Sequence, residues 1–393
     1  MCQPRRVQRW KQMNRLVLSA VRSVKHPKDA CRLLTSTARV CRKVVPLLSR
    51  DYARIFLRTL VLNRREFYTP EEAYRLGLLD PDFPESELCK YISRRKMLKI
   101  ERLLNPPTWE SVTDDKGIFY RYCNALGIPV PKLCALFFRT TAGWSSSGLI
   151  LKGRDDWERF LREELPSEFV VKPAQGYYGV RVNVFARTDT GEFVDGSGTS
   201  YTAGDLYESM ASDAGFDSFV IQERVRNHPE LMRLSGTEYL QTVRILTFID
   251  RNGECHVYHA HLRAIVGDNV IDNFEHGRTG NVHAEVYLDS GTLQPAFGPS
   301  ESGVGVATVY EHPKTGVAFE GFQLPMWPEA CAFAREVAFK FLPCRAFGWD
   351  IAMTPDGLLL IEANWNADPP TEHKKMDVVL PLLCEGEPFF PAG

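Results

Sequence analysis

Three oxygen-bearing side chains flank a predicted turn in the stretch GWDIAMTPDGLLLIEANWNADP, residues 348–369. The turn TPDG predicts a hairpin between two apolar strands, with Asp350 before it and Glu362 and Asn364 after it. Period-two alternation places Glu362 and Asn364 on one face of their strand. Two carboxylates and an amide oxygen are hard ligands that suit Mg²⁺, although a single hairpin acid is more often solvated or paired with a base. The coincidence of three such groups predicts a metal site.

A lysine stands where another apolar segment meets glycines. The segment EFVVK predicts a strand that ends at Lys172, and the following KPAQGYYGV contains Gly176 and Gly179. A strand that carries an ammonium group into such a turn can hold phosphate oxygens, because glycine lets backbone N–H groups approach. The spacing matches neither a P-loop nor a dinucleotide-binding fingerprint. A hairpin with a surface lysine is therefore the alternative for this segment taken alone.

Two predicted strands in the middle of the chain carry arginines. Arg244 lies in TVRILTF, and alternation places Arg263 on one face with His259 and His261. An arginine beside a phosphate site can stabilise a phosphoryl group in transfer, but each one alone could equally pair with an acid. The two histidines lack a third zinc ligand at useful spacing, so we interpret them as core or substrate-facing residues.

The elements that must position these side chains indicate a mixed α+β body. Strands are predicted at 168–172, 218–225, 242–250 and 254–266, and helices are predicted at 205–212 and 328–342. A helix is expected to begin at Thr69, with Pro70 in its first turn. The segment NPPTW at 105–109 breaks the chain and marks the expected end of a helical front part.

Composition sets broad limits on the protein. The chain has 393 residues, of which 44% are apolar and 25% charged, which is typical of a globular protein with two or three domains. No apolar stretch is long enough to span a membrane, and the N-terminus lacks a signal-peptide h-region. The ten cysteines are scattered without a Cys-x-x-Cys pair, which indicates reduced thiols in a cytoplasmic protein.

The front of the chain is strongly basic. Residues 1–65 contain 17 Lys and Arg against 2 Asp and Glu, and apolar residues recur there at helical spacing from Val7 to about Leu62. A helical bundle with a solvated basic face is the first interpretation. The second is docking on anionic lipid, at the inner face of the membrane, or on a partner there. Nucleic acid ranks third and is not expected as a partner, because no nucleic-acid-reading motif accompanies the charge.

Taken in order, these motifs resemble the ATP-grasp superfamily over about residues 110–385. The order is Lys116, VVKPAQGYYGV, FVIQERV, the Arg244 strand and the Asp350 hairpin. Within the superfamily the chain is most similar to the sugar-transfer-associated branch, as FYTPEEAYRLGLL, QTVRILTF and VIDNFEHGRTGN indicate. The resemblance implies an α+β ATP-grasp fold, in which two α+β lobes grip ATP, preceded here by a basic helical region instead of the usual Rossmann-like lobe. We expect the helical region at 1–109, the first lobe at 110–225 and the second lobe at 226–393.

The resemblance also implies roles for individual residues. Lys116 and Lys172 would bind the α- and β-phosphates of ATP under a closing loop that includes Gln175, Gly176 and Gly179. Gln222, Glu223 and Val225 would surround adenine, and Glu230 would contact the ribose. Asp350, Glu362 and Asn364 would hold two Mg²⁺ ions, for which Mn²⁺ can substitute, and Arg244 or Arg263 would steady the transferred phosphoryl group. Separately, the polar loop 267–281 is a candidate to face the acceptor through Asn273 and His276, and a surface loop of turn-forming residues is the alternative.

The family implies a reaction class. The first hypothesis is a ligase that activates a carboxylate as an acylphosphate and joins it to an amine, in the modification of a surface polysaccharide or a sugar precursor. The partners would then be a small-molecule acid and an amine, together with the polysaccharide-synthesis machinery. The second is a kinase of a sugar or another small-molecule hydroxyl. The third is an adaptor that binds nucleotide without catalysis, against which the intact trio of Asp350, Glu362 and Asn364 argues.

Overall fold

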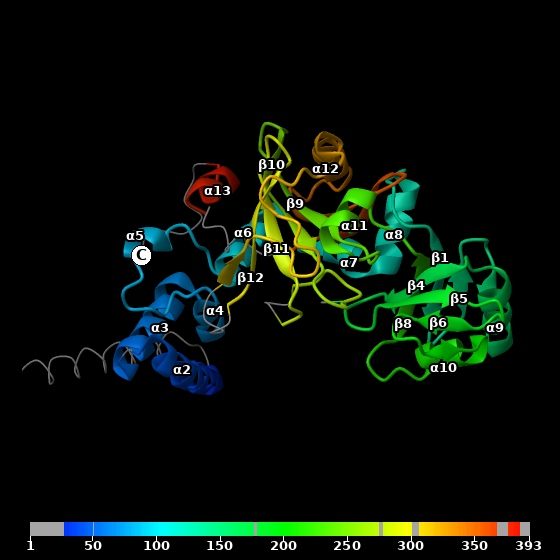
Figure 1. The fold of residues 1–393 in the computed structure, drawn as a ribbon, viewed down its shortest axis with the longest axis horizontal. Coiled ribbons are helices and arrows are strands. Elements are labelled where there is room, and N and C mark those ends of the chain that lie inside the picture. Colours follow the sequence, from blue (N-terminus) through cyan, green and yellow to red (C-terminus); the bar gives the residue numbers. More distant parts are fainter. Residues whose placement is uncertain are drawn as a thin grey trace, which may run out of the picture. The chain divides into compact units, whose positions relative to one another are not determined.

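The chain folds into two compact units, drawn in Figure 1. The computed structural model describes residues 27–49, 51–176, 179–274, 278–300, 306–367 and 376–385. The first unit contains Met1–Leu103, Phe297–Thr308 and Asp368–Gly393, and the second contains Leu104–Ala296 and Val309–Ala367.

The first unit is mainly helical. Its helices are α2 (Pro27–Leu48), α3 (Tyr52–Glu66), α4 (Pro70–Arg75), α5 (Glu85–Leu88), α6 (Arg94–Leu104) and α13 (Met376–Leu383). Val40 and Val44 of α2 are buried with Ile55 and Leu62 of α3 in one core. The apolar series predicted before residue 27 lies outside the described residues. None of the described helices combines the length and apolar character needed to cross a bilayer.

The helix start predicted at Thr69 is confirmed. The Thr69 hydroxyl accepts a hydrogen bond from the Glu72 N–H at 3.2 Å, and the Glu72 carboxylate accepts one from the Thr69 N–H at 3.3 Å. This reciprocal pair satisfies two backbone donors that a helix N-terminus leaves free. Helix α4 ends at Arg75.

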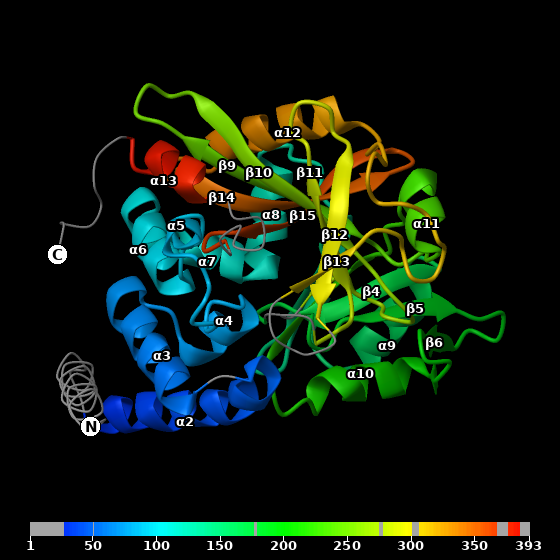
Figure 2. The ribbon, with the colours of Figure 1, turned by 60° about the vertical axis from the view of Figure 1, so that its left-hand side comes forward.

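The second unit contains the whole of one sheet, sheet A, and most of another, sheet B. Sheet A has the strand order β3-β2-β1-β8-β4-β5-β6-β7. Its strands are β1 (Leu133–Phe138), β2 (Gly143–Ser145), β3 (Ile150–Leu151), β4 (Glu168–Pro173), β5 (Asn183–Arg187), β6 (Phe193–Asp195), β7 (Ser200–Tyr201) and β8 (Ser218–Glu223). Helices α9 (Arg154–Glu163) and α10 (Ala203–Ala211) lie beside this sheet (Figures 1 and 2), and Trp157 and Met210 pack against Phe137 and Phe219. The helix predicted at 205–212 begins earlier, because Thr202 caps it in a second capping box.

Sheet B has the strand order β13-β12-β11-β10-β9-β14-β15. Its strands are β9 (Thr242–Ile249), β10 (Cys255–Ala264), β11 (Val282–Val286), β12 (Leu293–Pro299), β13 (Val306–Val309), β14 (Ala346–Thr354) and β15 (Gly357–Asn364). Helix α12 (Trp327–Lys340) packs on β9, β10 and β14. The predicted hairpin is therefore confirmed, with Thr354 and Gly357 paired at its turn.

Short helices accompany the two sheets. They are η1 (Pro107–Trp109), α7 (Glu110–Asp114), α8 (Lys116–Ala125) and α11 (Pro229–Ser235). Helix α8 touches both sheets: the Lys116 N–H donates to the Ala174 carbonyl beyond β4 at 2.8 Å, and the Tyr120 hydroxyl donates to the Ile361 carbonyl of β15 at 3.1 Å. A Cβ on Gly117 would lie 3.1 Å from Leu136 of β1, so glycine permits this close approach.

Candidate active site

A row of polar side chains crosses one face of sheet B. Glu362 pairs with Asp350, Asp350 with Arg244, Arg244 with His261 and His261 with Glu285, each on the neighbouring strand. Directly opposed residues project from the same face of a sheet. Asn364 pairs with Gly348, and since Gly348 lies two residues from Asp350, Asn364 shares that face. The expected grouping of Asp350, Glu362 and Asn364 on one face is thus confirmed, while their role as metal ligands stays a prediction.

Asp350 is held by both candidate arginines. The carboxylate is 1% exposed, and it accepts hydrogen bonds from Arg244 through Nε and Nη2 and from Arg263 through Nη2. Burial alone would raise the pKa of the Asp350 carboxyl, but the charges of Arg244 and Arg263 outweigh burial and hold that pKa below its ordinary value. Asp350 therefore stays ionised, and both of its carboxylate oxygens are paired with arginines.

A glycine makes room for this ion pair. A Cβ on Gly348 would lie 3.1 Å from Cδ of Arg244 and 3.0 Å from Leu246. Any other residue at 348 would crowd the arginine that grips Asp350. The glycine of GWD therefore matters for packing against its neighbours rather than for a turn.

The loop after β10 continues the polar face. Asp272 accepts hydrogen bonds from the Thr242 N–H at 2.8 Å and from its hydroxyl at 2.6 Å, and lies 3.6 Å from Nε of Arg263. Burial raises the pKa of the Asp272 carboxyl, and Arg263 opposes that rise. From the sequence, Asp272 was placed in the polar loop but given no role of its own.

Asn281 orders this loop through its side chain. Its amide donates to the carbonyls of Ile271 at 2.9 Å and Asn273 at 2.8 Å, and its oxygen accepts from the Val266 N–H at 3.0 Å. Asn273, which was predicted to face the acceptor substrate, thus lies on a loop that these bonds hold beside Arg263 and Asp272. His276, the other predicted acceptor residue, lies outside the described residues.

Two lysines approach Glu362 from the side of sheet A. Lys116 of α8 lies 3.2 Å from Oε1 of Glu362 and donates to the Gly176 carbonyl at 3.1 Å. Lys172 of β4 is 7% exposed and donates to the Tyr120 hydroxyl at 2.9 Å. Burial, together with the charge of Lys116, lowers the pKa of Lys172 to about 7, while Glu362 opposes the shift. The structure thus brings together Lys116, Lys172 and Glu362, which come from three different elements.

Tyr120 is a second residue that the sequence analysis missed. Its spacing of four residues from Lys116 places both side chains on one face of α8. That spacing was a usable signal, because residues four apart lie on the same face of a helix, one turn from each other.

The glycine turn after β4 adopts conformations that favour glycine. Gly176 has φ +156° and Gly179 has φ +66°. A Cβ on Gly179 would lie 2.4 Å from Cδ1 of Ile271, so this turn approaches the loop after β10. Gln175 donates to Asp115 at 3.3 Å. Residues 177 and 178 lie outside the described part of the chain.

The predicted adenine and ribose residues belong to β8, the segment after it and α11, and not to the strands of the charged row. Gln222 is 4% exposed, and no described group bonds its buried Oε1. The Glu223 carboxylate accepts from the Lys132 N–H at 2.9 Å, so that side chain already braces the strand end, and Val225 follows β8. Glu230 lies in the first turn of α11 (Pro229–Ser235) and pairs with Arg233 at 2.8 Å. The nucleotide contacts of these four residues stay predictions.

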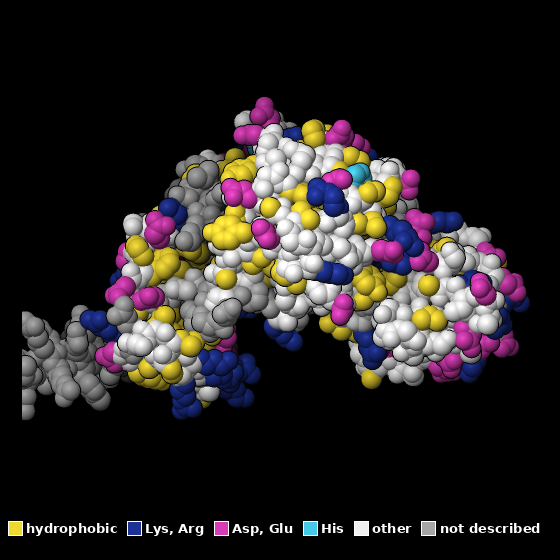
Figure 3. Space-filling view, in the orientation of Figure 1, with side chains coloured by type: hydrophobic (Ala, Val, Ile, Leu, Met, Phe, Trp, Pro, Cys, Tyr) yellow, Lys and Arg dark blue, Asp and Glu magenta, His cyan; other side chains and the backbone are white. Residues whose placement is uncertain are grey.

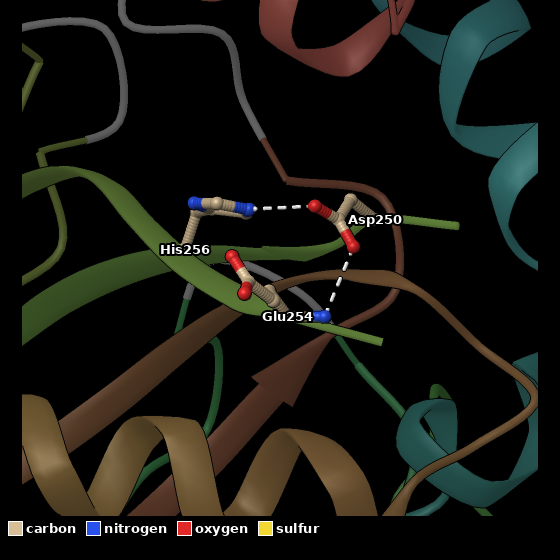
Figure 4. A group of neighbouring side chains, drawn as sticks. All are labelled: Asp250, Glu254 and His256. Atoms are coloured by element: carbon tan, nitrogen blue, oxygen red, sulfur yellow. Dashed lines mark hydrogen bonds and ion pairs between the residues drawn. The ribbon is translucent and has the colours of Figure 1, made fainter. Parts of the chain in front are cut away.

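A further group of possible ligands lies at the β9–β10 turn. Asp250, Glu254 and His256 each offer a ligand atom within 4.8 Å of the others (Figure 4). Asp250 accepts from the Glu254 N–H at 2.9 Å and lies 3.1 Å from Nε2 of His256. These bonds lower the pKa of Asp250, the backbone bond from Glu254 most. A stable hairpin turn accounts for this group without a metal.

A family model and several solved structures are similar to this chain. A family model described as sugar-transfer associated ATP-grasp matches residues 95–375. No curated protein matches the chain. Among solved structures, D-alanyl-alanine synthetase A from Vibrio cholerae O1 biovar eltor str. N16961 aligns with 12% identity and a TM-score of 0.39, over 70% of this chain and 65% of that one.

Two further structures give similar values. The D-alanine-D-alanine ligase from Coxiella burnetii has 12% identity and a TM-score of 0.32, over 64% of this chain and 48% of that one. The N5-carboxyaminoimidazole synthetase from Staphylococcus aureus has 10% identity and a TM-score of 0.38, over 75% and 58% respectively. The chain therefore spans less than two thirds of the length of each. The family match covers well over half of the sequence, so this chain belongs to the sugar-transfer associated ATP-grasp family and has an α+β ATP-grasp fold preceded by N-terminal helices.

Proposed function

We propose that the protein is an ATP-dependent ligase that activates a carboxylate as an acylphosphate and joins it to an amine. One observation carries the proposal: Lys116 and Lys172 meet Glu362 of the acidic hairpin, although they come from separate elements. Ammonium groups beside carboxylates are what a magnesium nucleotide needs, because the cations bind phosphate and the oxygens bind metal. Membership of the ATP-grasp family supports the same conclusion.

The donor set fits Mg²⁺ or Mn²⁺. Asp350, Glu362 and Asn364 offer hard oxygen atoms from one face, and Asp350 is ionised. A bound pair of ions would neutralise charge on the phosphates. The arginines that now hold Asp350 would then be free to contact the phosphoryl oxygens, so Arg244 and Arg263 serve the transferred group in this proposal.

The other roles follow the same division. Lys116 and Lys172 bind phosphate oxygens, and the turn with Gln175, Gly176 and Gly179 covers them and keeps water from the acylphosphate. Gln222, Glu223 and Val225 border the adenine and Glu230 the ribose, while Asn273 and His276 face the acceptor. The first lobe would end near residue 225, which the end of β8 at Glu223 supports.

The reaction class is tested by measuring products. Purified protein is incubated with MgATP and defined pairs drawn from amino acids and sugar-derived acids and amines, and ADP and inorganic phosphate are measured. A ligase releases both and requires both co-substrates, whereas a kinase forms ADP and a phosphorylated alcohol without free phosphate. If ADP forms with a single hydroxyl compound and no amine, the proposed ligase function is wrong and the protein is a kinase.

Gly179→Ala is expected to weaken MgATP binding about tenfold, because a left-handed backbone and a clash with Ile271 together displace the turn. Gly191→Ala is the matched control, since Gly191 has φ +83° and a methyl group there would meet no heavy atom within 4 Å. It carries the backbone strain without the clash. Isothermal titration calorimetry measures both, and equal losses in the two variants would contradict the assignment.

We also propose that the basic front places the enzyme on the cytoplasmic face of a membrane. Lys28, Arg32, Arg39, Arg42 and Lys43 are exposed on α2, and their spacing puts them on one side of the helix. Figure 3 shows Lys and Arg gathered there. The opposite side of α2 is buried in the first unit, so attraction to anionic headgroups, rather than insertion, would hold the helix.

Reversing three of these charges is expected to weaken vesicle binding. The variant Arg39→Glu, Arg42→Glu, Lys43→Glu should lose binding to phosphatidylserine–phosphatidylcholine vesicles at least tenfold, at about 1 kcal/mol per basic residue. Arg159→Glu with Arg162→Glu on α9 is the control of similar type. Cosedimentation at low and high salt is the measurement. Binding by the triple variant equal to wild type would exclude the α2 surface.

A further inference from the structure

A buried tyrosine stands between the two sheets beside the candidate phosphate site. Tyr120 is fully buried on α8, and its hydroxyl makes two bonds. It donates to the carbonyl of Ile361 in sheet B at 3.1 Å and accepts from Nζ of Lys172 in sheet A at 2.9 Å. The structure assigns Tyr120 as the positioning residue that aims the Lys172 ammonium at the nucleotide phosphates, an inference that rests on the proposed function.

The direction of the two bonds carries the argument. A phenol has one O–H to donate and lone pairs to accept. Since the O–H points to the Ile361 carbonyl, the lone pairs remain for Lys172. Burial, with Glu362 and Cys123, raises the pKa of Tyr120 well above its ordinary value, so the hydroxyl keeps its proton.

Lys172 needs such a guide because lysine is flexible. Its ammonium is a point charge on four rotatable bonds with three donors. Within the described part of the chain, Tyr120 is the one hydrogen-bond partner shown for it, and the ring lies 5.0 Å from Nζ. One donor fixed by Tyr120 leaves the other two oriented away from the tyrosine oxygen. Lys116 is held separately by Glu362 and Gly176, so the two lysines are fixed by different contacts.

The test uses Tyr120→Phe, which removes the hydroxyl and keeps the ring. Tyr122→Phe is the matched control, because Tyr122 lies on the same helix and its hydroxyl donates to the Lys340 carbonyl of α12 at 2.6 Å, away from Lys172. Calorimetry with adenosine, MgADP and MgATP measures each affinity. We expect Tyr120→Phe to weaken MgADP and MgATP about tenfold and to leave adenosine unchanged, while Tyr122→Phe changes none of the three.

A double-mutant cycle separates positioning from a general structural role. In a Lys172→Met background, Tyr120→Phe should weaken MgATP by no more than about twofold, because a residue that acts through Lys172 has nothing left to position. Additive losses, or an equal loss of adenosine affinity, would overturn the role of Tyr120. Absence of MgATP binding by the wild-type chain would instead overturn the proposed function. Thermal unfolding of each variant checks that the fold is retained.

Discussion

Lys172→Met is expected to weaken MgATP binding about a hundredfold and to remove the proton uptake that accompanies it. The wild-type lysine has a pKa of about 7 because it is buried beside Lys116, with Glu362 opposing the shift. Above pH 7 the free protein therefore holds a neutral amine, and phosphate, which favours the ammonium form, draws a proton onto it. Binding should take up close to one proton at pH 8, and affinity should fall as pH rises above 7.

Calorimetry in two buffers of different ionisation enthalpy measures this uptake. Lys152→Met is a suitable control, because Lys152 is an exposed lysine outside the candidate site. A wild-type protein that binds MgATP at pH 8 without proton uptake would show that Lys172 is already charged.

The lowered pKa of Lys172 also predicts how stability depends on pH. Folded Lys172 releases its proton near pH 7, whereas the unfolded lysine holds it to about pH 10.5. Between these values the unfolded state binds the extra proton, so the free energy of unfolding rises with pH as the cost of burying a charged lysine disappears.

Glu362→Gln is expected to reduce turnover at least about a thousandfold while the protein stays folded. Glu362 is the candidate metal ligand that also pairs with Lys116, so the amide removes a charge that both metal and lysine need. The dependence of nucleotide affinity on Mg²⁺ should fall with turnover. Thermal unfolding should change little, because the side chain is about one third exposed.

Asp356→Asn is the matched control for this change. Asp356 lies in the turn of the same hairpin and is exposed, and the substitution is again acid to amide. It should keep full turnover and the full effect of Mg²⁺ on nucleotide affinity. Normal activity of Glu362→Gln, or equal loss in both variants, would remove Glu362 from the metal site.

The acidic hairpin was predictable because its geometry is local. The turn TPDG and the alternation along two short strands place Asp350, Glu362 and Asn364 on one face without reference to the rest of the chain. The pairing of Asp350 with two arginines could be predicted only in part from the sequence. Alternation placed Arg263 with His261, but the register of β9 against β14, which sets Arg244 opposite Asp350, depends on strands about a hundred residues apart.

In the helices of the front part, too, local motifs could be read from the sequence, whereas contacts between distant segments could not. Thr69 and Glu72 specify the start of α4 through a four-residue motif, so the sequence located it. The basic and apolar sides of α2 were also visible as spacing. The basic side was expected to be solvated, and in α2 packing on α3 and α4 covers the apolar side and leaves the basic one exposed.

By itself, the amino-acid order determined the family, the α+β class, the hairpin of oxygen donors and the lysine at a strand end, since each rests on periodicity or on a motif of a few residues. Only the tertiary structure decided that Lys172 is buried against Tyr120, that Lys116 reaches Glu362, and that Asp272 supports Arg263. The two lysine contacts join elements that meet only where α8 packs between the two sheets, while the contact of Asp272 with Arg263 depends on how the loop after β10 folds. Side-chain burial and charge pairing, which decide the pKa of Lys172, arise from that packing and have no local signature.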